Sequence, residues 1–360
     1  MTVIGHTAHS SPGLRPRPSL PAPQISKSGK SRLGRLLGIQ FAGVGSYVPE
    51  TIVHNEDLSA LGCDSEWIKR RTGILERRRA APEQATSDLA IQAAQRCLEN
   101  AGAVAADVDL LIVATMTADS ATPSTACLVQ QSLGCIAPAM DINAACSGFM
   151  YALVTAGQFV RSGAAHNALV IGAEVMSRIV DPTDVKTYPL FGDGAGAVLL
   201  QPTDDMSKGL DSFTLGAEGS GGGLLSVAAG GSRQALNAQL LEQGAQYLRM
   251  EGRSVFKWAV NVVSESARDC MAHSSITVDD LDCVILHQAN SRIIDAAVSD
   301  FQMDPEKVFV NLDRYGNTSA ASIPLALDEA ISSGKLRSGG KALLCGFGAG
   351  LTWGTAVVQF

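Results

Sequence analysis

Three residues whose side chains can perform nucleophilic catalysis lie far apart in the chain: Cys146, His287 and Asn317. Cys146 lies in DINAACSGF, where its small neighbours leave the sulfur and the backbone open to a substrate, and an apolar helix is expected over 151–160. The start of a helix offers unpaired N–H groups and the positive end of the dipole, and both favour a thiolate. This context predicts a nucleophile, although a buried cysteine is more often structural.

His287 and Asn317 have contexts that fit a shared site with this cysteine. His287 follows an apolar strand and lies in LHQANSR, at the carboxyl end where open α/β sheets carry their chemistry. Asn317 lies in RYGNTSAASIP, just before an expected helix. Each also has a structural interpretation, a packed histidine or a helix N-cap. The Cys, His, Asn order and spacing occur in papain-like hydrolases too, but their Cys-Gly-Ser-Cys-Trp context is missing.

Composition limits the classes of protein that the chain can be. It has 360 residues, 46% of them hydrophobic, with 36 glycines, which is typical of a tightly packed α/β protein. No apolar run reaches the roughly 18 residues of a membrane span, and a net charge of −7 argues against nucleic-acid binding. The 8 cysteines are scattered without a Cys-x-x-Cys pair, which predicts reduced thiols and no zinc site.

The N-terminal segment differs from the rest. Residues 1–38 are rich in Ser, Pro and Gly, carry several Arg and Lys residues and have no acidic residue, so we predict a disordered tail. A transit peptide has a similar composition. We therefore expect a cytoplasmic protein, with a plastid as the alternative.

The remaining chain repeats one order of strands and helices. Glycine-rich GAGAVLLQ ends the strand pattern of residues 39–208, and WGTAVVQF ends that of residues 209–360. We predict two βα halves of similar plan, the first carrying Cys146 and the second carrying His287 and Asn317. Helices are expected over 86–101, 123–133, 255–272 and 319–332, and strands over 39–49, 107–115, 168–175, 192–201, 282–287 and 341–347.

From about residue 39 to the C-terminus the sequence closely resembles β-ketoacyl-[acyl-carrier-protein] synthase III. The resemblance rests on DINAACSGF, FGDGAGAVLL, LHQANSRII, LDRYGNTSAASIPLALDEA and GFGAGLTWGTA, in this order, together with DSEWIKRRTGI. It implies a thiolase-like α/β fold, in which duplicated βαβαβ halves form a five-layered α-β-α-β-α core.

The resemblance also implies a reaction. Cys146 takes an acyl group from acyl-CoA, malonyl-[acyl-carrier protein] then loses CO₂, and His287 and Asn317 stabilise the enolate that attacks the acyl group. Phe347 lies beside the departing carboxylate, and the backbone N–H groups of Cys146 and Ala349 form an oxyanion hole. No metal and no redox cofactor are needed, because the carboxylate of the substrate leaves as CO₂.

Three residues match the family's CoA-binding positions: Trp67 and Arg71 as a sandwich for the adenine, and Asn290. The sequence departs from the family at two further positions of the CoA site. Val185 stands where an arginine often lies near the CoA phosphates, with Lys186 beside it as a substitute, and Cys63 replaces a Thr or Ser at the mouth of the CoA site.

Further matches concern the protein partners. Arg292 and Lys257 match basic residues that receive the acidic acyl carrier protein, and the family is homodimeric. Thr122 stands where enzymes that use acetyl primers often carry Phe, in a loop that reaches the acyl pocket of the partner subunit. A smaller residue there suggests primers longer than acetyl.

Three alternatives remain open from the sequence. One is a related condensing enzyme of secondary metabolism with a longer primer or a CoA-borne extender. Another is a thiol hydrolase or acyltransferase that uses water or an amine as acceptor. The third is a non-catalytic partner subunit, against which the intact Cys, His and Asn set argues.

Overall fold

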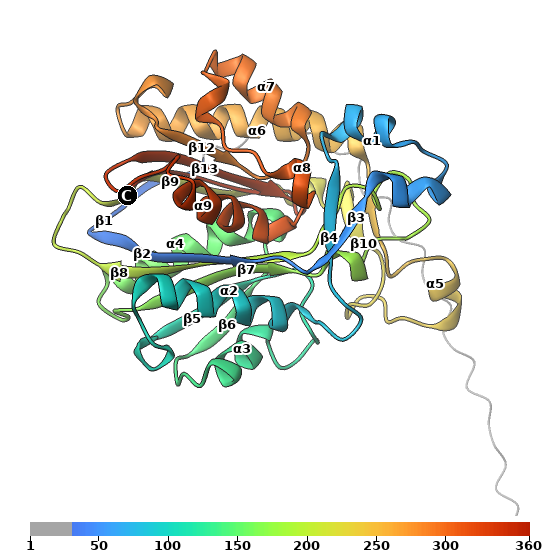
Figure 1. Cartoon of the computed structure of the whole chain (residues 1–360), viewed down its shortest axis with the longest axis horizontal. Helices are drawn as coiled ribbons and strands as arrows, with labels where there is room; N and C mark the ends of the chain where they lie inside the picture. The colour runs from blue at the N-terminus through green and yellow to red at the C-terminus, as the bar shows by residue number, and fades with distance from the viewer. Residues whose placement is uncertain (1–30) are drawn as a thin grey trace, which may run out of the picture.

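The computed structural model describes residues 31–360, and two five-stranded sheets form its centre (Figure 1). The N-terminal sheet has the order β2-β8-β7-β5-β6, and the C-terminal sheet has the order β1-β9-β14-β13-β12. The N-terminal sheet is built from β2 (Ile39–Tyr47), β5 (Leu110–Ala114), β6 (Ala139–Ile142), β7 (Ala168–Glu174) and β8 (Gly194–Pro202). The C-terminal sheet is built from β1 (Leu33–Leu37), β9 (Gly209–Ala217), β12 (Cys283–Leu286), β13 (Lys341–Gly348) and β14 (Thr352–Gln359).

The strand pairings of the two sheets follow one plan. In the N-terminal sheet β2 and β7 flank β8 as antiparallel neighbours, and β5 joins β7 in parallel. In the C-terminal sheet β9 and β13 flank β14 as antiparallel neighbours, and β12 joins β13 in parallel. The parallel β5–β6 pair has its counterpart in a single parallel bridge between Val284 and Val308. The repeated plan predicted from the sequence is therefore confirmed in the sheets.

Helices and sheets alternate in five layers (Figure 1). The helices α2 (Thr86–Ala101) and α3 (Thr125–Leu133) cover the outer face of the N-terminal sheet, and α6 (Gly252–His273) and α7 (Ser291–Phe301) cover that of the C-terminal sheet. Between the sheets lie α4 (Gly148–Arg161) and α9 (Ser322–Ser332). This confirms the predicted thiolase-like α-β-α-β-α core.

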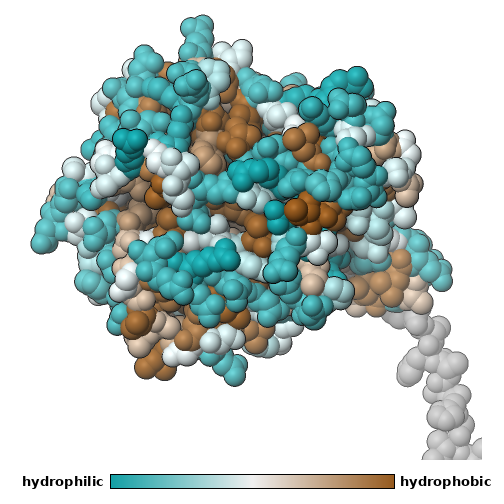
Figure 2. Space-filling view, in the orientation of Figure 1, coloured by the Kyte–Doolittle hydropathy of each residue, from teal (hydrophilic) through white to brown (hydrophobic). Residues whose placement is uncertain are grey.

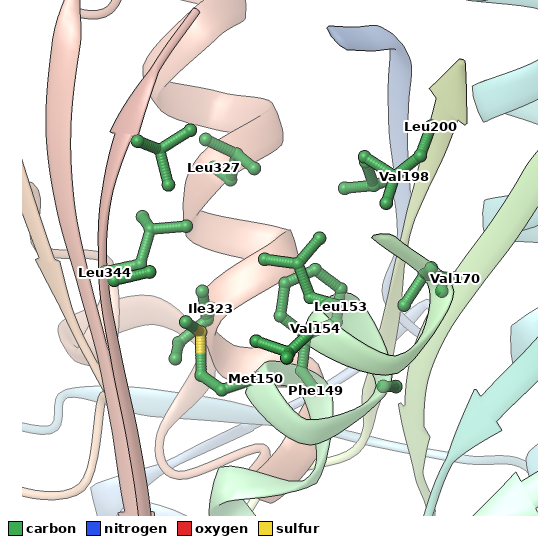
Figure 3. Close-up of a cluster of buried hydrophobic side chains, with 14 of the residues drawn as sticks. Phe149, Met150, Leu153, Val154, Val170, Val198, Leu200, Ile323, Leu327 and Leu344 are labelled. Carbon is green, nitrogen blue, oxygen red and sulfur yellow. The ribbon is translucent and has the colours of Figure 1, made fainter. Parts of the chain in front are cut away.

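The helix sequences explain the layers. The outer helix α2 has one buried stripe at helical spacing, so one face meets the sheet and the other meets water. The central helices are apolar on almost all sides because both sheets cover them. Figure 3 shows Phe149, Leu153 and Met150 of α4 facing Ile323 and Leu327 of α9. This cluster anchors the segments that precede both helices, and those segments carry Cys146 and Asn317.

The predicted N-terminal tail is wrong in its last part. Residues 33–37 form β1, which pairs antiparallel with β9 at the edge of the C-terminal sheet. Leu36 is buried there, and it packs in the central cluster. The segment around this short LGRLL strand is rich in Ser, Pro and Arg, and such a composition predicts disorder rather than a strand. The rest of the tail, and with it the transit-peptide alternative, falls on residues 1–30, which lie outside the described residues.

Smaller elements lie at one end of the layers, beside the carboxyl ends of the central strands (Figure 1). They are β3 (Thr51–His54), α1 (Ser65–Thr72), β4 (Glu76–Arg79), β10 (Leu225–Val227), α5 (Ala238–Glu242), β11 (Leu248–Met250) and α8 (Leu312–Tyr315). Figure 2, in the same view as Figure 1, shows hydrophilic and hydrophobic residues mixed over the surface turned toward the viewer. None of the helices in residues 31–360 is long and apolar enough to span a membrane.

Candidate active site

Cys146 lies in a single 3-10 turn, η3 (Ala145–Ser147), between β6 and α4. This is the strand-to-helix junction that the sequence predicts. The turn is tight, since Ala145 has a φ of 47° in the left-handed region that few residues with side chains adopt. Cys146 is buried, with 5% of its surface exposed.

The end of β13 packs directly against this turn. A Cβ added to Gly348 would lie 2.8 Å from the backbone nitrogen of Cys146, and one added to Gly346 would lie 3.1 Å from the Cα of Ser147. Only glycine permits such a close approach of two backbones. The GFGAG motif is therefore a packing surface for the nucleophile, and it places Phe347 and Ala349 next to it.

His287 follows β12, and it is held at both its backbone and its ring. Its backbone nitrogen donates to the carbonyl of Cys345 at 2.8 Å, and its Nδ1 lies 2.7 Å from Ser322 Oγ. The Phe347 ring packs edge-on against the imidazole, with the centroids 5.1 Å apart. Burial lowers the pKa of His287 to about 3, so the imidazole is neutral at physiological pH.

Asn317 belongs to the C-terminal half, but its backbone is hydrogen-bonded to residues of the N-terminal half. Its backbone nitrogen donates to Leu190 O at 2.8 Å, and its carbonyl accepts from Gly192 N at 3.0 Å. Its side-chain Oδ1 accepts from the backbone nitrogen of Ser319 at 2.8 Å. With Oδ1 occupied in this way, Nδ2 is the group of the amide that can donate to a substrate.

These contacts bring the three residues into one buried site. The turn η3, which carries Cys146, contacts both β13 and the turn η8 (Ser319–Ala321), which begins two residues after Asn317. Phe347 then connects the thiol to the imidazole, because its neighbour Gly348 lies against Cys146 while its own ring packs on His287. The structure thus places the thiol, a neutral imidazole and a carboxamide together, as the sequence predicts.

The protonation state of the thiol corrects the sequence analysis. Burial raises the pKa of Cys146 to about 12, the hydrogen bond from Ser319 acts in the opposite direction, and the charge of Glu174 raises the pKa further. The helix start was expected to favour a thiolate, but desolvation is the larger effect here. The resting nucleophile is therefore a thiol.

Sequence reasoning missed four polar residues that support the site. Ser322 fixes the His287 ring, and Ser319 donates from its backbone nitrogen to Asn317 Oδ1. Thr352 Oγ1 lies 2.8 Å from Ser147 Oγ and donates to the carbonyls of Ala144 and Ala349 at 3.0 and 2.8 Å, respectively. Glu174 is fully buried at the end of β7 and accepts a hydrogen bond from Ser319. A carboxylate that ends an apolar strand was the one signal available in the sequence.

The predicted CoA residues lie together. Trp67 and Arg71 are on α1, and Asn290 is the N-cap of α7, from which its Nδ2 donates to Arg71 O at 3.1 Å. The guanidinium of Arg71 lies 4.8 Å from the centroid of the Trp67 ring, in direct contact with it. An adenine between the two therefore requires Arg71 to move.

The residues that depart from the family pattern at the expected CoA site differ in their exposure. Lys186 is exposed and Val185 and Cys63 are partly buried, so an ammonium group is accessible beside the valine. Whether Lys186 replaces the missing arginine stays a prediction.

The predicted partner residues lie on the surface. Lys257 on α6 and Arg292 on α7 are exposed on packed helices, and Arg292 lies over the ring of Phe256 with a centroid distance of 5.7 Å. Thr122 is exposed in the segment between β5 and α3. Within residues 31–360 no cluster of three or more His, Cys, Asp or Glu could hold a metal ion. The eight cysteines are all free.

Comparison with known families agrees with the fold. Residues 140–219 match the family model for 3-oxoacyl-[acyl-carrier-protein] synthase III, and residues 271–360 match the model for its C-terminal part. The first match contains Cys146, and the second contains His287 and Asn317.

Individual relatives match over nearly the whole chain. A β-ketoacyl-[acyl-carrier-protein] synthase III of Rhodopirellula baltica is 59% identical over 345 residues, which cover 91% of this chain and 100% of the relative. The crystal structure of 3-oxoacyl-[acyl-carrier-protein] synthase III from Aquifex aeolicus has a TM-score of 0.83 at 42% identity, covering 90% of this chain and 100% of the other. The Thermus thermophilus structure has the same score and identity, with 89% and 98% covered.

The layered fold and the Cys, His and Asn site define a thiolase-fold acyltransferase. Within this class, the chain belongs to the β-ketoacyl-[acyl-carrier-protein] synthase III family.

Proposed function

We propose that the chain condenses an acyl-CoA primer with malonyl-[acyl-carrier protein] and so starts fatty-acid synthesis. The products are 3-oxoacyl-[acyl-carrier protein], CoA and CO₂. The observation that carries this proposal is the meeting of Cys146 with a neutral His287 and an oriented Asn317 amide in one buried site. A nucleophile and two uncharged donors are what an acyl-enzyme and a developing enolate require.

The first half of the reaction loads the enzyme. The sulfur of Cys146 attacks the thioester carbonyl of acyl-CoA, and the adduct collapses to acyl-Cys146 and CoA. Backbone N–H groups of Cys146 and Ala349 would hold the oxyanion, and the contact between Gly348 and Cys146 supports their nearness.

The second half forms the carbon–carbon bond. Loss of CO₂ from malonyl-[acyl-carrier protein] leaves an enolate, whose oxygen accepts hydrogen bonds from His287 and Asn317. One such donor contributes on the order of 3–4 kcal/mol in comparable oxyanion sites. The neutral state of His287 leaves one ring nitrogen as donor while the other faces Ser322. The enolate carbon then attacks acyl-Cys146, and the thiol is regenerated. Phe347 shields the departing carboxylate, and no cofactor is required.

Recognition of the carrier protein is part of the proposal. The chain has a net charge of −7, so an acidic partner needs a local positive surface. The exposed side chains of Arg292 and Lys257, on neighbouring helices, supply it. We propose that these two residues bind the carrier protein while Trp67, Arg71 and Asn290 bind CoA.

Homodimerisation and primer choice are linked through one edge of the molecule. The strand β6 is the last strand of the N-terminal sheet, so one side of it is open to pair with a second copy. Near it Ile136 is 94% exposed, which is unusual for an isoleucine on a free surface. We propose that two copies associate along β6 and that the small Thr122 widens the acyl pocket of the partner subunit. Location in the cytoplasm belongs to the same proposal.

Intact-mass spectrometry with acetyl-, butyryl- and octanoyl-CoA tests the loading step, and CO₂ release with malonyl-[acyl-carrier protein] against malonyl-CoA tests the extender. The proposal predicts acyl-Cys146 with the longer primers and CO₂ release with the carrier-bound extender. A strict acetyl preference contradicts the widened pocket. Thioester hydrolysis without CO₂ release supports a hydrolase, and a preference for malonyl-CoA supports the secondary-metabolism alternative.

A further inference from the structure

Glu174 is a fully buried carboxylate that the reaction described above does not use. Its Oε2 accepts hydrogen bonds from Thr117 Oγ1 at 2.5 Å and Thr115 Oγ1 at 3.1 Å, and the backbone nitrogens of Met116 and Thr117 also donate to it. Its Oε1 accepts from Ser319 Oγ at 2.9 Å. The first set of donors follows β5 in the N-terminal half, whereas Ser319 begins η8 in the C-terminal half. Glu174 therefore joins the two halves beside the candidate site.

Ser319 is also the residue that orients the side chain of Asn317. Its backbone nitrogen donates to Asn317 Oδ1 at 2.8 Å, and it does so with a φ of 49°. This left-handed conformation is unfavourable for a residue with a Cβ. The Ser319 hydroxyl donates to the Glu174 carboxylate, and a charge-assisted hydrogen bond of this kind offsets the cost. Glu174 thus stabilises the backbone conformation that occupies Oδ1 and leaves Nδ2 as the donor for a substrate.

The N-terminal half contains the same turn without a serine hydroxyl. There Ala145 has a φ of 47°, and its backbone nitrogen donates to Asn143 Oδ1 at 3.2 Å. Ala145 begins η3 directly before α4, as Ser319 begins η8 directly before α9. The reaction described above gives the Asn143 amide no role, and alanine has no hydroxyl that could bind a carboxylate. The hydrogen bond between Ser319 and Glu174 is therefore found in the half whose asparagine serves the chemistry.

The backbone of η8 also lies directly against β7. A Cβ added to Gly172 would collide with the carbonyl oxygen of Ala320, so only glycine allows this approach. Gly172 comes two residues before Glu174 on β7, and residues two apart on a strand face the same side. The packing of Gly172 thus brings η8 within reach of the carboxylate, and the hydrogen bond to Ser319 then fixes the start of the turn.

We propose that Glu174 is a positioning residue for the decarboxylation step, and that it acts through Ser319 on the carboxamide of Asn317. An amide turned by half a rotation would present Oδ1 instead of Nδ2 to the enolate oxygen, and two acceptors would then face each other. The backbone N–H group of Ser319 prevents this rotation as long as the turn keeps its conformation. Acylation of Cys146 uses no group of this series, so it does not depend on Glu174.

Separate measurements of the two half-reactions at pH 8 test this role. Burial raises the pKa of Glu174 to about 7, so the group is mainly ionised at pH 8. Ser319→Ala removes the hydroxyl but keeps the Cβ. We expect kcat for CO₂ release from malonyl-[acyl-carrier protein] to fall about tenfold with an unchanged KM, the loss of about one hydrogen bond. Acyl-Cys146 formation, measured by intact mass, should stay at the wild-type rate. An equal loss in both half-reactions would overturn the proposal.

Two further variants separate the hydroxyl from the backbone and from the charge. Ser319→Gly also lacks the hydroxyl, but glycine adopts the left-handed conformation freely, so this variant should release CO₂ faster than Ser319→Ala. In Glu174→Gln the donors at Oε2 hold the amide oxygen, and the NH₂ group then faces Ser319. A neutral hydrogen bond replaces a charge-assisted one, and CO₂ release should fall about fivefold with normal acylation. The reverse order of the two Ser319 variants, or wild-type CO₂ release by Glu174→Gln, would contradict the proposal.

Double variants distinguish positioning from a general packing effect. In an Asn317→Ala background Ser319→Ala should cause no further loss of CO₂ release, because the side chain through which it acts is absent. In a His287→Ala background the same substitution should still cost about tenfold. Equal further losses in both backgrounds would overturn the positioning role. The inference rests on the proposed function. A wild type without acylation and CO₂ release defeats that function itself, whereas an active wild type with independent losses defeats the positioning role alone.

Discussion

Gly348 lies so close to Cys146 that a Cβ on the glycine would be 2.9 Å from the Cβ of the cysteine. The two residues come from different halves of the chain, one from the end of β13 and the other from η3. Their contact fixes where the nucleophile stands relative to His287, because His287 lies beside Phe347, the residue before Gly348. The site is thus assembled by the packing of the halves against each other.

This contact predicts a specific effect of a single methyl group. Gly348→Ala must push η3 away, since 2.9 Å is shorter than two side-chain carbons allow. We expect acyl-Cys146 formation to fall at least tenfold, measured by intact mass. Gly223→Ala is the matched control, because a Cβ there meets nothing within 4 Å, and it should acylate normally. Equal rates for the two variants would contradict the packing role of Gly348.

Ser322 is expected to serve the second half of the reaction only. Its Oγ is 2.7 Å from His287 Nδ1, and a hydroxyl that donates to Nδ1 leaves Nε2–H free to donate. Ser322→Ala removes this partner, and we expect CO₂ release to fall about tenfold, the equivalent of one hydrogen bond. Acylation of Cys146 should stay at the wild-type rate. An equal loss in both half-reactions would point to general damage instead.

Acid stability should depend on two buried groups with opposite effects. Unfolded His287 takes up a proton near its ordinary pKa of 6.5 and folded His287 only near about 3, so stability is lost as the pH falls below 6.5. Folded Glu174 takes up a proton near about 7, before the unfolded residue at 4.5, so stability is gained over that range. Between pH 6.5 and 4.5 the two contributions oppose each other.

Variants separate these contributions in urea unfolding. Glu174→Gln removes the stabilising uptake, so its free energy of unfolding should fall more steeply from pH 6.5 to 4.5 than that of the wild type, by about 1.4 kcal/mol per pH unit. His287→Gln should show the reverse change in slope. Curves that run parallel to the wild type would show that these groups do not titrate as buried residues.

The basic residues on α6 and α7 should act on the carrier protein and not on the chemistry. Lys257→Glu and Arg292→Glu should raise the KM for malonyl-[acyl-carrier protein] at low salt, while acylation by acyl-CoA changes little. The effect should shrink as salt is added. Lys335→Glu is the control, because Lys335 is exposed in the loop before β13, at the end of the strand away from Phe347. A similar rise for the control would argue against a docking surface.

Much of the fold was predictable because its signals are local. The helix expected over 86–101 is α2 within the same bounds, since its apolar positions repeat at helical spacing. The central strands were expected as continuous apolar runs, and β7 is buried at every position. The strand β1 escaped prediction because its burial depends on β9, which lies far along the sequence.

The candidate site, too, was predictable where its signals are local and not where they depend on the fold. The motifs around Cys146, His287 and Asn317 are visible in the sequence, and the structure brings these residues together. The protonation state of the Cys146 thiol cannot be predicted from the sequence. Its pKa is set mainly by burial, which comes from the packing of both halves and outweighs the effect of the local helix start. Ser319 and Glu174 lie in different halves too, so only the fold shows that they are hydrogen-bonded to each other. The distance between Arg71 and Trp67 likewise depends on side-chain conformation.

The most direct test of the account measures the two half-reactions separately in one set of variants. Intact mass reports acyl-Cys146 formation, and labelled CO₂ reports decarboxylation of malonyl-[acyl-carrier protein]. We predict that Cys146→Ala forms no acyl-enzyme. His287→Ala and Asn317→Ala should still be acylated but should release CO₂ at least 100-fold more slowly than the wild type. Acylation of Cys146→Ala, or unchanged CO₂ release in the other two variants, would contradict the account.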